Sequence, residues 1–135
     1  MNEKVRSKYL ELQALQHQLS QVQKQIEALG SQAGEMDVVA KALDEFKKVE
    51  AGSELFVTLT PGVFVRARIE DTGSVLLNVG GGAVVKKSVE DGKNIIVEQS
   101  KELRNLQKEL SDQLEKLAER AQSVQGELQE LVSDV

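Results

Sequence analysis

Two hydrophobic seams, one toward each end of the chain, constrain the fold more than any other feature of this sequence. In the first seam, apolar residues follow one another three and four positions apart from Leu12 to Leu43. In the second, an apolar residue recurs every seven positions from Val89 to Leu131. A repeat of about 3.5 residues keeps one stripe of a helix facing a partner helix. Both segments are therefore predicted to be helices of a coiled coil.

A companion series accompanies the second seam, and its spacing changes along the helix. Its members are Leu106, Leu114, Ala121, Leu128 and Val135. Leu106 lies four residues before Leu110 and Leu114 lies four residues after it, which interrupts the alternation of three and four. Such an interruption is a stutter, and it predicts local unwinding of the supercoil at Leu110.

The helix ends carry their own signals. The first helix is predicted to run from the first few residues to about Val49, with lysines in its last turn and Gly52 as its cap. The second helix is predicted to follow Ser88, whose hydroxyl caps an acidic first turn. Gly30 and Gly34 lie inside the first helix, where each costs about 1 kcal/mol relative to Ala. They mark either a soft spot with a bend or tolerance on an exposed face.

The two seams match each other as an antiparallel pair within one chain. With Leu43 placed opposite Ile96 and Leu12 opposite Leu128, the numbers of facing residues add up to nearly the same value along both helices. Basic residues near the N-terminus then meet acidic residues near the C-terminus. At about 1.5 Å per residue, we expect a coil of roughly 60–70 Å with both chain ends at its tip. Pairing of the same helices between different chains is the alternative.

The segment between the helices, residues 54–86, is predicted to form four short strands in two hairpins separated by glycine turns. Both faces of the first hairpin carry apolar residues, with Phe56 and Phe64 on one face and Val57 and Val65 on the other. Isolated hairpins are marginal in water, and open strand edges invite pairing. The hairpins are therefore predicted to assemble with strands of other subunits.

The predicted fold class is α+β, with a long antiparallel intramolecular coiled coil and two β-hairpins at one end of it. The expected divisions are an N-terminal coiled-coil helix over residues 1–50, an assembly region of two hairpins over residues 51–87, and a C-terminal coiled-coil helix over residues 88–135.

Motifs that carry chemistry are scarce. His17 is the only histidine and falls on the outer face of the first helix, and cysteine is absent. No Ser/His/Asp or Cys/His set is available as a result. The glycines at 80–82 do not begin a phosphate-binding loop, because Val85 precedes Lys86 where that motif requires glycine. The chain is therefore predicted not to be an enzyme and to need neither a cofactor nor a metal ion.

The charge and hydropathy patterns limit the partners. A net charge of −5 argues against a nucleic-acid partner, because phosphate binding needs clustered Lys and Arg. An arm that docks on a polymerase or another nucleic-acid machine is a further alternative, which this charge disfavours. No apolar run approaches the roughly 20 residues of a membrane span, and the N-terminus lacks the apolar core of a signal peptide. We expect a cytoplasmic protein without a membrane partner.

The middle of the chain resembles a known family. The stretch VFVRARIEDTGSVLLNVG, at residues 63–80, is followed by glycines and by VVKKSVED, at residues 84–91, which leads into the second helix. In this stretch, and in the order helix, two hairpins, helix, the sequence resembles prefoldin. Two hairpins rather than one favour the alpha class, and an archaeal type is expected. Gly92 departs from the pattern, because a better helix former is expected in the first turn of a helix.

The resemblance implies an ATP-independent chaperone, or holdase. Members of the family form a hexamer of two alpha-class and four beta-class subunits, whose hairpins join in an intersubunit β-barrel. They grip unfolded proteins with the tips of their coils and deliver them to a group II chaperonin. The implied partners are beta-class prefoldin subunits, unfolded client proteins and a group II chaperonin. A structural relative that assembles with itself into filaments through its hairpins is the alternative.

Two sets of residues are predicted to carry these roles. The tip set, expected to contact clients where the helix ends fray, consists of Val5, Tyr9, Leu12, Leu128, Leu131, Val132 and Val135. The assembly set, expected to pack against other subunits, consists of Phe56, Val57, Phe64, Val65, Leu76, Leu77 and Val79. The alternative for both sets is burial within the subunit itself, where the tip set closes the coil and the assembly set fills the subunit's own hairpins.

Overall fold

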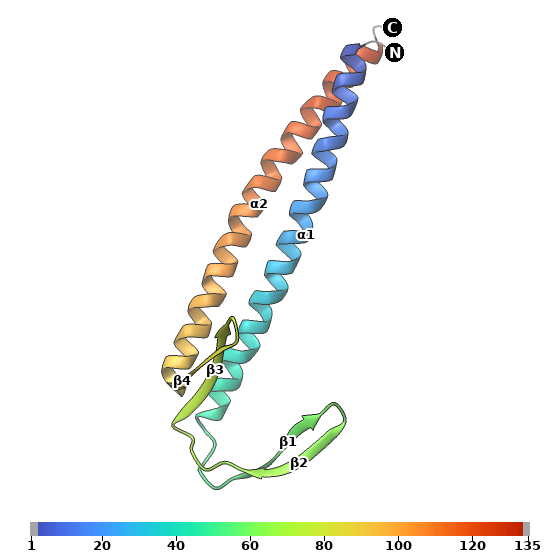
Figure 1. The fold of residues 1–135 in the computed structure, drawn as a ribbon. Helices are drawn as coiled ribbons and strands as arrows, with labels where there is room; N and C mark the ends of the chain where they lie inside the picture. The colour runs from blue at the N-terminus through green and yellow to red at the C-terminus, as the bar shows by residue number, and fades with distance from the viewer. Residues whose placement is uncertain (1–2, 134–135) are drawn as a thin grey trace. The chain divides into compact units, whose positions relative to one another are not determined.

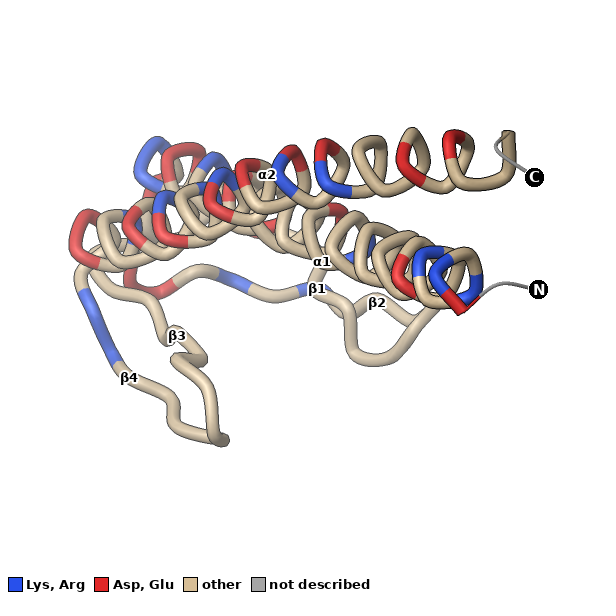
Figure 2. The backbone as a smooth tube through the Cα atoms, turned by 90° about the horizontal axis from the view of Figure 1, so that it is seen from above, with Lys and Arg blue, Asp and Glu red and all other residues tan. Residues whose placement is uncertain are grey.

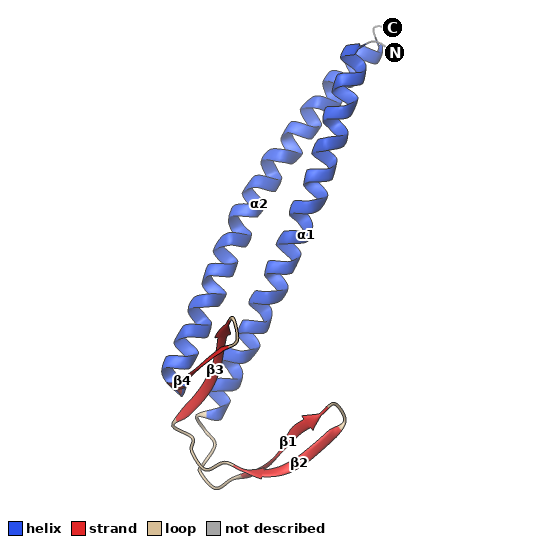
Figure 3. Cartoon of the chain, viewed as in Figure 1, coloured by secondary structure: helices blue, strands red, loops and turns tan. Residues whose placement is uncertain are grey.

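The computed structural model describes residues 3–133, which form two helices and four strands (Figures 1 and 3). In chain order the elements are α1 (Glu3–Phe46), β1 (Glu54–Thr60), β2 (Val63–Arg68), β3 (Ser74–Gly80), β4 (Ala83–Ser88) and α2 (Val89–Ser133). The predicted α+β class, with two long helices around two hairpins, is confirmed.

The chain divides into two compact units. The first unit contains residues 1–33 and 101–135, and the second contains residues 34–100. The first unit is thus a pair of helical segments, one from α1 and one from α2. The second unit holds the remaining parts of both helices together with the two hairpins.

The core of the first unit confirms antiparallel pairing within the chain. It consists of Leu15, Ala121 and Val124, with Leu12, Leu19 and Leu117 packed around them. Residues early in α1 therefore pack against residues late in α2. Val124 is fully buried, and burial of a side chain of this size contributes about 1.5–3 kcal/mol relative to exposure.

Gln107, not Leu106, occupies the seam in this unit. Leu106 is 45% exposed, whereas Gln107 is partly buried and donates from Nε2 to the carbonyl oxygen of Ile26 at 3.1 Å. With Gln107 between Leu103 and Leu110, the spacing of four and three continues, so the predicted stutter is wrong. A pattern of apolar residues does not include Gln107, but an amide can lie in the seam when a carbonyl of the facing helix satisfies it.

Gly30 provides the space for this amide. A Cβ atom at residue 30 would lie 2.8 Å from Nε2 of Gln107, whereas nothing lies within 4 Å of the equivalent position at Gly34. α1 is helical through both glycines. Gly30 therefore faces the partner helix and permits a close contact, while Gly34 is simply tolerated.

The core of the second unit joins both helices to the second hairpin. Its buried residues are Leu43, Val89 and Ile96, with Met36, Ala40, Phe46 and Val75 packed around them. Ser100 is also buried, and its hydroxyl donates to Oδ1 of Asp37 at 2.8 Å. A satisfied polar pair of this kind favours one register of a coil over others.

The ends of the helices differ in part from the prediction. α1 ends at Phe46, and Lys47 and Lys48 lie in the turn that follows it rather than in its last turn. Gly52 does not cap the helix, because its N–H donates to the carbonyl oxygen of Ile69 at 2.6 Å in the turn before β1. The predicted cap of α2 is confirmed, since the N–H of Asp91 donates to Oγ of Ser88 at 3.1 Å.

The four strands form two separate antiparallel hairpins, as predicted. β1 pairs with β2 and β3 pairs with β4, each as a two-stranded sheet. Gly62 and the glycines at 80–82 adopt φ values between 61° and 102° in the turns, a region that favours glycine.

Gly92 is buried beneath the second hairpin. A Cβ atom at this position would lie 3.2 Å from Cδ1 of Leu77 and 3.3 Å from Cγ2 of Val75. The absence of a side chain therefore lets β3 approach the first turn of α2. This close packing explains a glycine where helix propensity alone favours another residue.

Ion pairs connect the end of α1 with the start of α2 in the second unit. Lys47 bonds Glu90, and Lys93 lies 2.7 Å from Asp44, which is also 3.8 Å from Lys47. The hydrogen bond from Lys93 holds the pKa of Asp44 below its ordinary value, and the hydrogen bond from Lys47 does the same for Glu90. The bond to Asp44 raises the pKa of Lys93.

We predict different gains in stability for two alanine substitutions in α1. Gly34→Ala should raise the free energy of unfolding by about 1 kcal/mol, the ordinary gain in a helix interior. Gly30→Ala should gain less, because the new methyl group displaces the Gln107 amide from a hydrogen bond worth about 1 kcal/mol. Urea unfolding at one protein concentration, followed by circular dichroism, measures both. Equal gains would show that Gly30 is as open as Gly34.

We also predict that the Asp44–Lys47–Glu90–Lys93 network stabilises the chain only within a window of pH. Lowered carboxyl pKa values mean that its contribution is present above the ordinary values of 3.8 and 4.5 and is lost as pH falls through the lowered ones. Because the pKa of Lys93 is raised, its contribution to stability is present below pH 10.5 and is lost as pH rises through the raised value.

The comparison is between the wild type and the Asp44→Asn/Glu90→Gln variant. The difference in melting temperature should be largest near neutral pH, should vanish in acid, and should shrink in high salt because the groups are solvent-accessible. A difference that stays constant from neutral pH into strong acid would contradict the assignment.

Candidate functional site

Exposed apolar side chains are concentrated in the hairpins. Those at least partly in contact with water include Leu55, Phe56, Val57, Leu59, Val63, Phe64, Val65, Leu76, Val79 and Val84. Phe56 is 66% exposed and Leu76 is 70% exposed. Exposed apolar side chains gathered in one region are typical of a protein-interaction site.

The first hairpin has two faces of different character. Val57 lies opposite Val65 on an aliphatic face. On the other face Phe56 lies opposite Arg66, whose guanidinium carbon is 5.8 Å from the centre of the Phe56 ring. Phe64 shares this aromatic and basic face, since strand residues two apart point the same way. The two-sided apolarity predicted from the sequence is therefore present, and neither face is covered within the described chain.

One face of the second hairpin packs against α2 in its own unit, and the other face is exposed to solvent. Leu77 is partly buried and contacts the Gly92 position, while Leu76, one residue earlier, lies on the exposed face. Val79, near the end of β3, is also exposed. Within the assembly set, Leu77 thus differs from the other members, all of which are exposed.

The members of the tip set that the structure describes lie at the paired helix ends of the first unit. Tyr9 and Val132 are 50% and 56% exposed. The partly buried members are Val5, Leu12, Leu128 and Leu131. Val135 lies outside the described residues. Leu10 is exposed as well and was missed by the sequence reasoning, because it falls on the back of the helix, away from the seam.

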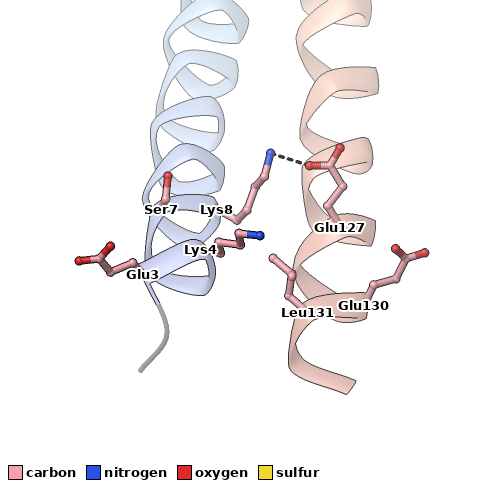
Figure 4. Close-up of a pocket in the computed structure, with 7 residues that line it drawn as sticks. All are labelled: Glu3, Lys4, Ser7, Lys8, Glu127, Glu130 and Leu131. Atoms are coloured by element: carbon pink, nitrogen blue, oxygen red, sulfur yellow. Dashed lines mark ion pairs between the residues drawn. The ribbon is translucent and has the colours of Figure 1, made fainter. Parts of the chain in front are cut away.

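A charged cluster bridges these helix ends on one side. Lys8 lies 2.6 Å from Glu127 and 3.5 Å from Glu11, and Glu11 lies 2.6 Å from Arg120. Figure 4 shows Lys8 and Glu127 reaching toward each other from the two helices. The hydrogen bond to Glu127 raises the pKa of Lys8, and the hydrogen bond from Arg120 lowers the pKa of Glu11. These pairs link the two helix ends, beside the apolar core that joins the helices.

Charged groups elsewhere are spread along the helices. In Figure 2 acidic and basic residues both occur along α1 and α2, while β1 and β3 are mostly uncharged. Among residues 3–133 no group of three or more His, Asp or Glu side chains is arranged to hold a metal ion. Neither helix, over its described length, is apolar enough to cross a membrane.

Comparison with known proteins identifies the same family as the sequence motifs. The Prefoldin subunit family profile matches residues 15–134. Prefoldin subunit alpha of Methanobrevibacter smithii is 28% identical over 84% of this chain and 73% of its own length. Prefoldin subunit alpha of Thermococcus onnurineus is 35% identical over 64% of this chain and 63% of its own length.

A solved structure shares the fold. The cryo-EM structure of filamentous PFD from Methanocaldococcus jannaschii is similar, with a TM-score of 0.61, over 94% of this chain and 99% of that chain. The two sequences are 18% identical, so this similarity supports the fold and no particular function.

The fold and the sequence matches agree. Prefoldin is a family of chaperones rather than of enzymes, and its subunits assemble with one another. The profile covers most of this chain, and the relatives named above are alpha subunits. The chain therefore belongs to the prefoldin family, as a subunit of its alpha class.

Proposed function

We propose that this chain is a subunit of an ATP-independent holdase that binds unfolded proteins and delivers them to a group II chaperonin. The observation that carries the proposal is the apolar surface left exposed in two separate places, the hairpins and the paired helix ends. The two surfaces suit different steps of this function. The hairpins suit assembly, and the helix ends suit client binding.

The assembly step involves the hairpins. A two-stranded sheet leaves one edge of each strand without hydrogen-bond partners, and such edges accept strands from other chains. Burial of exposed apolar area would contribute about 25 cal/mol per Å². We propose that the assembly set packs into an intersubunit β-barrel with beta-class subunits, in a hexamer of two alpha-class and four beta-class chains.

The client step involves the tip set. Half-exposed residues such as Tyr9 and Val132 offer apolar contacts that are weak one at a time. Several such ends in one complex would raise the overall affinity by avidity, without new contacts at any single end. Weak individual contacts also allow release to a chaperonin. We propose that this work takes place in the cytoplasm, with neither a nucleic-acid nor a membrane partner and without an enzymatic step.

The alternative is a structural role. The fold is compatible with this role, because filamentous PFD has the same fold. A filament could use the same hairpin surfaces, with copies of this chain in place of beta-class subunits. The two functions differ in the size of the assembly and in its response to a beta-class partner.

Removing the helix ends should separate client capture from assembly. A variant that lacks residues 1–10 and 127–135 loses most of the tip set but keeps every residue of the hairpins. We predict that it assembles normally and no longer suppresses the aggregation of an unfolded client, measured by light scattering of the client.

A matched pair of point variants controls for damage by truncation. Tyr9→Ser/Val132→Ser should weaken protection, whereas Leu106→Ser, which also removes an exposed apolar side chain from α2, should not. If the truncated complex protects clients as well as the full one, the proposal that the helix ends bind clients is wrong.

Assembly itself should fail when the aromatic face of the first hairpin is made polar. We predict that Phe56→Ser/Phe64→Ser dissociates the complex at micromolar concentration while its helix content stays unchanged. Val38→Ser is the matched control, because Val38 is 68% exposed but lies on α1. Sedimentation velocity measures the mass of each variant. An intact complex in the double variant would show that this face does not join subunits.

A further inference from the structure

Two grooves lie between the helix ends of the first unit. The charged groove, with a volume of about 580 Å³, is lined by Glu3, Lys4, Ser7, Lys8, Glu127, Glu130 and Leu131. The neutral groove, with a volume of about 520 Å³, is lined by Leu12, Gln125, Leu128, Gln129, Val132 and Ser133. Successive helix residues are about 100° apart, so Gln125, Gln129 and Val132 lie on one side of Leu128, and Glu127 and Leu131 on the other. The grooves therefore flank the seam on opposite sides.

The charged groove is the larger one but is poorly suited to an apolar ligand. The Lys8–Glu127 pair spans it at 2.6 Å, and Glu130 points away from the neighbouring helix (Figure 4). An apolar segment entering this groove would have to remove water from these ions, which is costly unless their pairing survives. Leu131, which points toward α1, is its one apolar lining residue.

The neutral groove contains no charged side chain among its six lining residues. Its apolar surface comes from Leu12, Leu128 and Val132, and Val132 is among the most exposed apolar residues of α2. Its polar surface comes from two glutamines and a serine. An apolar ligand can therefore enter it without displacing water from an ion.

The neutral character continues along this side of both helices. Residues three and four apart share one side of a helix. The positions on this side, here called the neutral flank, are Val5, Tyr9, Gln13 and Gln16 of α1 and Gln122, Gln125, Gln129 and Val132 of α2. None of the eight is charged, although 29% of the chain is Asp, Glu, Lys or Arg.

Glutamine amides suit a partner without a fixed sequence. Each amide both donates and accepts hydrogen bonds. The backbone of an extended polypeptide presents the same donors and acceptors whatever its side chains are. The four glutamine amides nearest the ends, at 13, 16, 125 and 129, are exposed and lie beside Tyr9, Leu12, Leu128 and Val132. Amides and apolar groups together match a backbone with apolar side chains.

We propose that the neutral flank is the client-binding face of the first unit and that it takes extended, uncharged apolar segments of unfolded polypeptide. This inference rests on the proposed holdase function and adds to it the face and the class of client. The charged groove on the opposite side is less suited to such segments, because the Lys8–Glu127 ion pair spans it. Charged client segments are disfavoured, because the neutral flank offers no counter-charge to offset their desolvation.

The test adds the same charge to either flank of the assembled complex. Gln125→Glu/Gln129→Glu places two carboxylates on the neutral flank with almost no change of shape. Gln18→Glu/Gln113→Glu is the matched control, because Gln18 lies one heptad after Glu11 and Gln113 one heptad before Arg120, both on the charged side. The probes are a fluorescent uncharged apolar peptide and an analogue with glutamates at alternate positions, measured by anisotropy.

The wild type should bind the uncharged peptide at least about tenfold more tightly than its analogue, a difference of about 1.4 kcal/mol. The neutral-flank variant should weaken uncharged-peptide binding several-fold, and the control should not. A photoreactive residue at position 129 should crosslink the peptide, whereas one at position 18 should not. Such a crosslink would show that the peptide contacts this chain and not only other subunits of the complex.

Each contrary result overturns a different statement. Equal weakening by the two variants, or crosslinking only from position 18, overturns the choice of face. Equal binding of the two peptides overturns the class of client. If the wild-type complex neither binds peptides nor suppresses aggregation, the proposed function fails, and this inference fails with it.

Discussion

Two strands cannot bury the apolar residues that the first hairpin carries on both faces, and this constraint shapes the behaviour of the whole chain. Every residue of β1 is exposed, including Phe56 and Leu59. The second hairpin meets the constraint in part, by packing Val75 and Leu77 near Gly92. The first has no such cover among the described residues of its unit. Partner strands from other chains would bury these residues, which is why we propose assembly as the primary role of the hairpins.

The helices, unlike the first hairpin, bury their apolar residues against each other within the chain. In each unit a small apolar core joins α1 to α2, and a polar contact accompanies it, Gln107 to Ile26 in the first unit and Ser100 to Asp37 in the second. A polar group within a coil stabilises one register, because any shift leaves it without its partner. Ion pairs in each unit add a further preference for this alignment. The helices therefore pair within the chain, and the hairpins remain available for other subunits.

Much of the fold could be predicted from the sequence because its local signals are strong. The strands begin where the turn glycines and the alternation of apolar residues place them, and Ser88 caps α2 as expected. What was missed depends on contacts between distant segments. Gln107 replaces Leu106 in the seam because a carbonyl of the facing helix satisfies its amide. Gly92 is present because β3 packs on it, which helix propensity cannot reveal.

The presence of exposed apolar side chains in the hairpins and near the helix ends was predictable, but their detailed arrangement was not. The tip and assembly sets follow from apolar patterning, which indicates surfaces that need a partner. Periodicity alone could not distinguish Leu77, which is partly used inside its own unit, from the exposed Leu76. The difference between the neutral flank and the charged side at the helix ends also requires the pairing of α1 with α2. Lys8 and Glu127 form an ion pair on the charged side because the pairing of the two helices brings them together.

The most direct test of the central claim, that the exposed hairpins exist to join other subunits, is the native mass of the chain by light scattering, alone and after mixing with a beta-class prefoldin subunit. Assembly through the hairpins predicts a small oligomer alone that converts to a discrete hexamer on mixing. A polydisperse polymer that the partner leaves unchanged would favour the filament. A stable monomer that does not bind the partner would contradict this role, because the hairpins would then remain exposed without any function in assembly.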